Sequence, residues 1–162
     1  MRRTWAPRGQ TPILRCPGRW TKISASSAIT VSPKRRKLAL YARFLPNKNI
    51  GSMETAAFLR QLARHLRGRI IVLWDSGSQH KGAPVRSFRE AHPAWEFHRF
   101  PGYAPELNPD EFVWKLLKGA VANSDPRDTS HLKRLLHRPL MRLRQSQKLL
   151  WSCIYASDLP WK

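Results

Sequence analysis

Acidic side chains are scarce in this chain of 162 residues. It holds ten Asp and Glu against 30 Lys and Arg, which gives a formal net charge of +20, and no acid precedes Glu54. So strong a positive field attracts polyanions, most often nucleic acid, through phosphate contacts that release counterions. A membrane surface would instead favour one localised polybasic run, whereas basic residues here extend from Arg2 to Lys162. We therefore expect nucleic acid as the partner and no membrane.

Cysteine and long apolar runs are also nearly absent. Cys16 and Cys153 form neither a CxxC pair nor a zinc-ligand spacing, which argues against a disulfide framework or a zinc site. No apolar run reaches the roughly 20 residues that a membrane span needs, and no apolar region follows the basic N-terminus as in a secretion signal. A Ser-His-Asp arrangement and a glycine-rich phosphate loop are missing too. The expected location is cytoplasmic.

The first half of the chain predicts a hairpin, a helix and a buried strand. Residues 22–31 and 37–44 alternate in polarity around a turn at 32–36, which is typical of an antiparallel hairpin. A helix capped by Ser52 and stopped by Gly68 should follow, with Phe58, Leu59, Leu62 and Leu66 as its apolar stripe. The run RIIVLWD at 69–75 predicts a strand buried on both faces.

The second half predicts alternating helices and strands. The expected elements are a helix at 84–92, a strand at 95–100, a rigid loop at 101–105, a helix capped by Asn108 with Pro109 first and an apolar face of Phe112, Val113, Leu116, Leu117 and Ala120, and a basic helical segment after about residue 127 that breaks at Pro139. The order indicates an α/β fold with a mixed sheet flanked by helices.

Asp75 is the first candidate for chemistry. It ends the buried strand, where open α/β sheets place their ligands, and a carboxylate there can bind a hard cation such as Mg²⁺. The alternative is an Asp that merely caps the following turn.

Glu111 is the second candidate. Helical spacing places it about opposite the apolar stripe of its helix, near Lys115 and Lys118. The alternative is a capping-box Glu that stabilises the first turn after Asn108. Two carboxylates plus a third could hold two metal ions, one activating a water or 3′-hydroxyl and the other stabilising the leaving oxygen.

Three segments resemble the catalytic domain of mariner-like bacterial insertion-sequence transposases of the DDE superfamily. They are VLWDSGSQHKGAPVRSF at 72–88, PGYAPELNPDEFVWKLLK at 101–118 and TWAPRGQTP at 4–12. The resemblance covers nearly all of the chain and is most specific in the second segment, where Asn108, Glu111 and Trp114 match the family pattern. Ser76 departs from it, because the family usually has Asn there.

The resemblance implies an RNase H-like fold and Mg²⁺- or Mn²⁺-dependent cleavage and joining of DNA strands, with two ions in the complete site. It assigns the second metal-binding acid to Asp75 and the third to Glu111. His80 matches the family's His after the Asp, and we assign it with the basic Lys115, Lys118, Lys133 and Arg134 to nucleic-acid binding. Transposon ends and target DNA are the implied partners, in a bacterial, nucleoid-associated protein.

The family's first catalytic Asp lies on a strand upstream of the segment that 4–12 resembles, and this chain has no acid there. We therefore expect residues 1–125 to form an incomplete catalytic domain that lacks the first strand, and 126–162 to be its basic helical C-terminal segment. We expect little or no strand transfer by this chain alone, which would act with an upstream transposase fragment or as a homodimer.

Two alternatives remain at this stage. The chain could be a non-catalytic, basic DNA-binding remnant of a transposase, which uses its charge and not its acids. It could also be a small basic structural protein, for example of a ribonucleoprotein particle, although the block around Glu111 argues against that.

Overall fold

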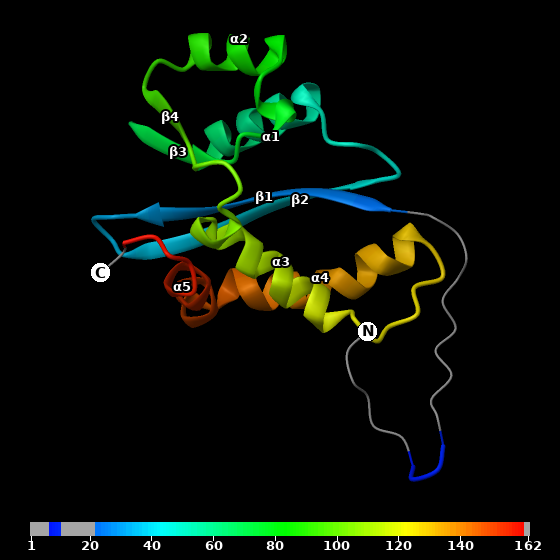
Figure 1. The fold of residues 1–162 in the computed structure, drawn as a ribbon. Coiled ribbons are helices and arrows are strands. Elements are labelled where there is room, and N and C mark those ends of the chain that lie inside the picture. Colours follow the sequence, from blue (N-terminus) through cyan, green and yellow to red (C-terminus); the bar gives the residue numbers. More distant parts are fainter. Residues whose placement is uncertain (1–6, 11–21, 161–162) are drawn as a thin grey trace.

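The computed structural model describes residues 7–10 and 22–160 and places four strands between and beside five helices (Figure 1). The elements are β1 (Ile23–Ser32), β2 (Lys37–Pro46), α1 (Ser52–His65), β3 (Ile70–Trp74), the 3₁₀ turn η1 (Ser78–His80), α2 (Ala83–Ala91), β4 (Trp95–Arg99), the 3₁₀ turn η2 (Pro105–Leu107), α3 (Pro109–Ala120), α4 (Thr129–Gln145) and α5 (Gln147–Tyr155). This order confirms the predicted α/β sequence of elements. The segment resembling family sequence at 4–12 lies mostly outside the described residues.

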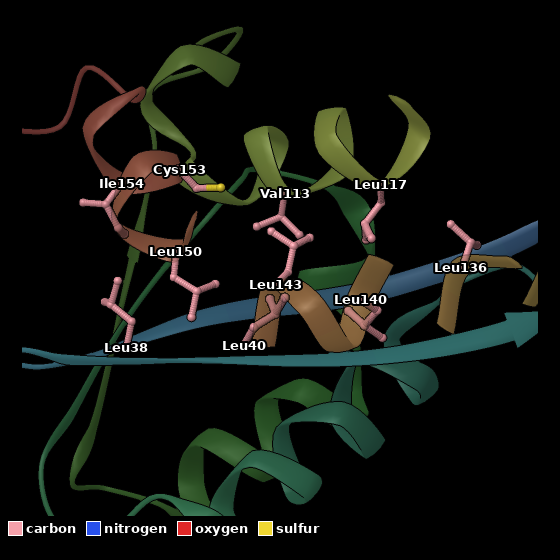
Figure 2. Packing of buried hydrophobic residues seen from close by; sticks show 10 residues of the cluster. All are labelled: Leu38, Leu40, Val113, Leu117, Leu136, Leu140, Leu143, Leu150, Cys153 and Ile154. Carbon is pink, nitrogen blue, oxygen red and sulfur yellow. The ribbon is translucent and has the colours of Figure 1, made fainter. Parts of the chain in front are cut away.

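The β1–β2 hairpin separates two hydrophobic cores. Its antiparallel register runs from Ile23 opposite Pro46 to Ser32 opposite Lys37, as the alternation predicted. On one face the buried Leu38 and Leu40 pack with α3, α4 and α5, as Figure 2 shows. On the other face Tyr41 packs against the cluster built by α1, α2, β3 and β4. Both faces of the hairpin are therefore covered, which fixes its register because a one-residue slip would exchange the two faces.

Side chains of α4 and α5 also satisfy backbone groups of β2. The Arg144 guanidinium donates to the carbonyls of Leu40 and Ala42, at 3.1 and 3.3 Å. The Gln147 side chain accepts from the Leu38 N–H at 2.9 Å and donates to the Leu38 carbonyl at 2.8 Å. An edge strand otherwise presents unpaired backbone groups to other chains. These bonds close that edge and attach the C-terminal helices to the hairpin.

The prediction that the strand at 69–75 is buried on both faces is wrong. Strands β3 and β4 are parallel, with Ile70 opposite Trp95, and helices α1 and α2 cover one face only. Ile71 and Leu73 on the other face are 66% and 44% exposed. Every position of this strand is apolar, so the sequence shows no alternation that would indicate which face is exposed.

Two predicted helix boundaries need correction. Gly51 and not Ser52 is the N-cap of α1, and the helix ends at His65, before Gly68. Pro139 does not break the C-terminal segment, because α4 continues through it to Gln145. Proline removes one helical hydrogen bond, but the buried Leu136 and Leu140 on either side of it hold the helix against the core.

The apolar face predicted for α3 is narrower than expected. Val113 and Leu117 are buried, but Leu116 is 43% exposed and Ala120 is exposed. The strands also differ from a single mixed sheet, since β1–β2 and β3–β4 form two separate two-stranded sheets. Among the described strands, β1 and β3 therefore each keep an unpaired edge. None of the described helices is long and apolar enough to cross a membrane.

Candidate functional site

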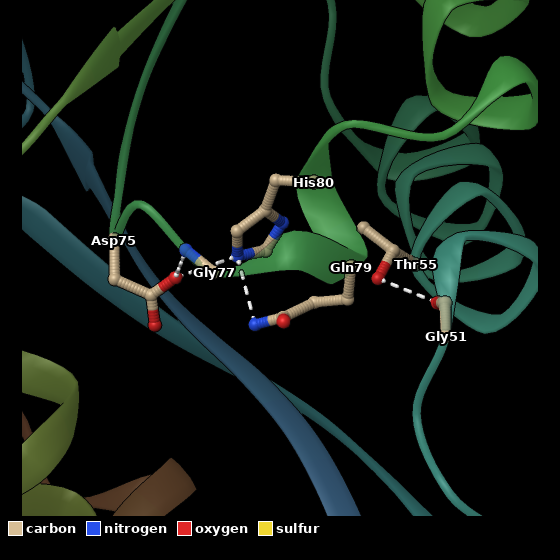
Figure 3. A network of polar contacts seen from close by, with 6 residues as sticks. All are labelled: Gly51, Thr55, Asp75, Gly77, Gln79 and His80. Atoms are coloured by element: carbon tan, nitrogen blue, oxygen red, sulfur yellow. Dashed lines mark hydrogen bonds and ion pairs between the residues drawn. The ribbon is translucent and has the colours of Figure 1, made fainter.

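Asp75 follows the last residue of β3 and points away from the sheet (Figure 3). Its Oδ1 accepts a hydrogen bond from the Gly77 N–H at 2.8 Å and lies 3.0 Å from Nε2 of His80. Its side chain is 59% exposed, and no described residue hydrogen-bonds its Oδ2. Contacts within the turn thus hold Oδ1, and Oδ2 has no partner among the described residues.

His80 is enclosed beside that carboxylate. Its side chain is 15% exposed and its ring stacks on Trp74, with centroids 4.3 Å apart and an interplanar angle of 25°. Burial lowers the pKa of His80, and the neighbouring Asp75 carboxylate opposes this in part. The sequence assigned His80 to nucleic-acid binding, and the structure places it against Asp75 and Trp74.

Glu111 lies in the first turn of α3, where the predicted cap is confirmed. The Asn108 side chain accepts from the Asp110 N–H at 3.1 Å. The capping box does not form, because the Asn108 N–H donates to the Pro105 carbonyl at 3.0 Å and not to Glu111. The exposed Glu111 carboxylate has no hydrogen-bond or ion-pair partner among the described residues, so capping does not account for it.

A pocket of about 650 Å³ opens beside Glu111. Two carboxylates, two lysine ammonium groups and one aromatic ring line it. The lining residues are Pro105, Glu106, Glu111, Phe112, Lys115, Lys118, Gly119 and Ala122. The Lys115 Nζ lies 6.0 Å from the centre of the Phe112 ring. The two lysines that the sequence assigned to phosphate contacts therefore share a pocket with the candidate catalytic Glu111.

Asp110, the residue before Glu111, has an enclosed carboxyl group. Its Oδ2 accepts from the Ser27 hydroxyl in β1, while its Oδ1 is buried without a partner among the described residues. Burial raises the pKa of Asp110 to about 6, although the Ser27 hydrogen bond opposes the shift. This contact fixes the start of α3, and with it Glu111, against the middle of the hairpin.

Backbone contacts relate the elements that carry Asp75 and Glu111. The Phe100 N–H donates to the Trp74 carbonyl at 2.8 Å, so the loop that leads into α3 leaves β4 beside the end of β3. In the described part of the chain, no three His, Cys, Asp or Glu side chains cluster closely enough to hold a metal ion by themselves. Mg²⁺ commonly uses one or two carboxylates and completes its shell with water and phosphate oxygens, and the donor types of Asp75 and Glu111 fit that pattern.

The other two predicted cations lie on the neighbouring helix α4. Lys133 and Arg134 are exposed on α4, which packs against α3 through their shared core. Neither forms an ion pair with a described acid. The four cations of α3 and α4 are therefore available to an anionic ligand.

Sequence reasoning missed the residues that surround Asp75 and His80. The end of the Gln79 side chain lies close to Gly77, in the space that a Cβ there would occupy. Trp74 is buried at the end of β3 and stacks on the His80 ring. The short spacing from Trp74 to His80 across a glycine turn was the available signal.

Known proteins resemble the chain in sequence and in fold. A family model described as DDE superfamily endonuclease matches residues 1–133. The crystal structure of the catalytic domain of Mos1 mariner transposase is similar, with a TM-score of 0.52, 16% identity, and coverage of 85% of this chain and 83% of that one. A Mos1 transposase paired-end complex with the left transposon end gives a TM-score of 0.66 and 18% identity, over 95% of this chain and 46% of that chain.

These likenesses confirm the expected RNase H-like fold. The Mos1 catalytic domain with raltegravir and Mg is also similar, with a TM-score of 0.51 and 15% identity over 86% of this chain and 85% of that one. The chain spans about half the length of the Mos1 chains in the DNA complexes. No curated protein matches the chain in sequence.

The carboxyl group of Asp110 predicts a pH-dependent stability difference. With a pKa of about 6 in the folded state against 3.8, the protonated form stabilises the fold below about pH 4, and this contribution is lost as the pH rises through 6. Asp110→Asn keeps a neutral side chain at every pH. Its stability relative to wild type should therefore rise by about 2 kcal/mol between pH 4 and pH 8, as measured by urea unfolding. A difference that does not change with pH would contradict the enclosed carboxyl.

Proposed function

The chain belongs to the DDE superfamily of endonucleases, and from this membership we propose that it is a transposase catalytic domain that cleaves and joins DNA strands with divalent metal ions. Asp75 and Glu111 are the proposed metal-binding acids. The observation that carries the proposal is that both carboxylates keep oxygens without described partners. The loop that leads toward α3 starts beside the end of β3, and Glu111 shares a pocket with Lys115 and Lys118.

The acids and the lysines have different proposed roles. When bound, a pair of Mg²⁺ or Mn²⁺ ions activates a water or 3′-hydroxyl and stabilises the leaving oxygen. Asp75 and Glu111 would hold these ions through hard carboxylate oxygens. Lys115 and Lys118 would position the DNA phosphates beside Glu111 in the pocket. Similar Mos1 catalytic domains in structures with Mg and with Mn support the choice of metal.

The third acid of the family site is proposed to come from a segment outside these 162 residues. The family site implies three acids, and no Asp or Glu precedes Glu54 in these 162 residues. The unpaired edges of β1 and β3 could accept a strand that carries one. An upstream transposase segment is the proposed source, so residues 1–162 by themselves would be inactive.

A non-catalytic DNA-binding role is the second candidate function. The net charge of +20 supports it, as does the lack of a three-ligand cluster among the described side chains. This role would need the cations of α3 and α4 but neither Asp75 nor Glu111, so variants of the acids and of the cations separate the two functions.

Cleavage should require both acids and the segment that supplies the third acid. We expect residues 1–162 with Mn²⁺ to leave transposon-end DNA intact, and to cleave it when the fragment that bears the third acid is added. Asp75→Asn or Glu111→Gln should then reduce cleavage to background, because each removes a metal ligand. Gel analysis of end-labelled DNA measures this.

Glu90→Gln is the matched control, since Glu90 is exposed on α2. It should cleave as the wild type does. Robust cleavage by residues 1–162 alone would refute the need for that segment, and full cleavage by the two acid variants would refute the catalytic proposal.

DNA affinity should fall steeply with salt and depend on the cations of α3 and α4. Each phosphate contact contributes about −0.9 to the slope of log affinity against log salt concentration. Replacing Lys115, Lys118, Lys133 and Arg134 by Gln should therefore make the slope less negative by up to about 3 to 4. Fluorescence anisotropy at several salt concentrations measures it.

A charge-matched variant tests whether position matters as well as charge. It replaces four exposed arginines of the α1–α2 side: Arg60, Arg64, Arg67 and Arg86. Its slope should change less than that of the first variant. Equal changes would argue against a defined interface, and a flat salt response of the wild type would exclude both DNA-binding functions.

A further inference from the structure

The contact between His80 and Asp75 is oriented by the surroundings of both residues. His80 Nε2 lies 3.0 Å from Asp75 Oδ1, which also accepts the Gly77 N–H (Figure 3). Both contacts use the same carboxylate oxygen. Together they fix the plane of the carboxylate and direct the other oxygen, Oδ2, away from the turn.

The chemistry of the pair decides which ring nitrogen carries the proton. An ionised carboxylate only accepts hydrogen bonds, so Nε2 must bear the hydrogen that bridges it to Oδ1. The other ring nitrogen, Nδ1, is buried and has no partner among the described residues. In this tautomer Nδ1 is the bare acceptor nitrogen of the ring.

Packing holds the ring in this orientation. Trp74 stacks on His80 at a centroid distance of 4.3 Å and contacts Phe97 at 4.9 Å with the rings tilted by 40°. The Gln79 amide nitrogen lies 3.3 Å from His80 Nε2. Two N–H donors cannot bond each other, so a hydrogen on Nε2 requires the Gln79 amide oxygen to face the ring. The stack on Trp74 holds the plane of the ring beside Asp75.

We propose that His80 is a positioning residue, which donates from Nε2 to Asp75 Oδ1 and so presents Oδ2 to the metal ion. This rests on the proposed role of Asp75 as a metal ligand. Residues that hydrogen-bond a metal ligand orient it, and their loss typically weakens metal binding about 10- to 100-fold. The 15% exposure of His80 leaves little surface for the DNA contact that the sequence suggested.

Two substitutions separate the hydrogen bond from the stack. His80→Phe keeps a ring against Trp74 and removes the donor, whereas His80→Gln loses the ring and can place an amide N–H near the position of Nε2. His98→Phe is the matched control, because His98 is exposed and lies 3.9 Å from the exposed Glu96. Mn²⁺ binding to each purified variant, measured by electron paramagnetic resonance, is the readout, with circular dichroism to check folding.

We expect His80→Phe to weaken Mn²⁺ binding about 10- to 100-fold, His80→Gln to stay within a few-fold of wild type, and His98→Phe to have no effect. Equal binding by folded His80→Phe and wild type would overturn the proposal. Asp75→Asn tests the proposed metal ligand separately from the positioning role of His80. If it leaves Mn²⁺ binding unchanged, the proposed metal ligand is wrong; if it weakens binding while His80→Phe does not, only the positioning role is wrong.

The wild-type protein offers a test that needs neither a variant nor a metal. Long-range ¹H–¹⁵N correlation spectra of the imidazole distinguish protonated from bare ring nitrogens. A hydrogen on His80 Nε2 is the expected result. A bare Nε2 would overturn the proposal even if the substituted proteins fail to fold.

Discussion

The two-sided burial of the β1–β2 hairpin is the constraint on which the rest of the structure depends. One face takes the leucines Leu38 and Leu40 into the core of α3, α4 and α5, and the other packs toward α1 and α2. Arg144 and Gln147 then satisfy the backbone of β2. Because the hairpin contacts both cores, a displacement of its register would disturb every element that carries a candidate site residue.

The hairpin also sets the position of Glu111. The Ser27 hydroxyl donates to the enclosed Asp110 carboxyl, which holds the first turn of α3 against β1 at the cost of a raised pKa. Asp75 is held separately, by the turn that contains Gly77 and His80. The start of α3 thus holds Glu111, and the turn after β3 holds Asp75 independently. Neither of these two segments supplies a third acid.

Local signals predicted most of the fold and long-range contacts explain the rest. Alternation predicted the hairpin, and Asn108 followed by Pro109 predicted the start of α3. Pro139 failed as a helix breaker because packing on both sides of it outweighs one lost hydrogen bond. The exposure of Ile71 depends on which faces distant helices cover, and the enclosure of Asp110 depends on Ser27, which lies far away in the sequence. Pattern and resemblance identified Asp75 and Glu111, but not the residues that hold them.

The most direct test of the central claim asks whether Asp75 and Glu111 bind the same metal centre. Fe²⁺ replaces Mg²⁺ at oxygen-ligand sites and, with ascorbate and peroxide, produces radicals that cut the nearby backbone. The account predicts two cut sites, near residues 75 and 111, and loss of both in either Asp75→Asn or Glu111→Gln. Cutting near only one of these residues, or two cuts that each depend only on the nearer acid, would contradict a shared centre.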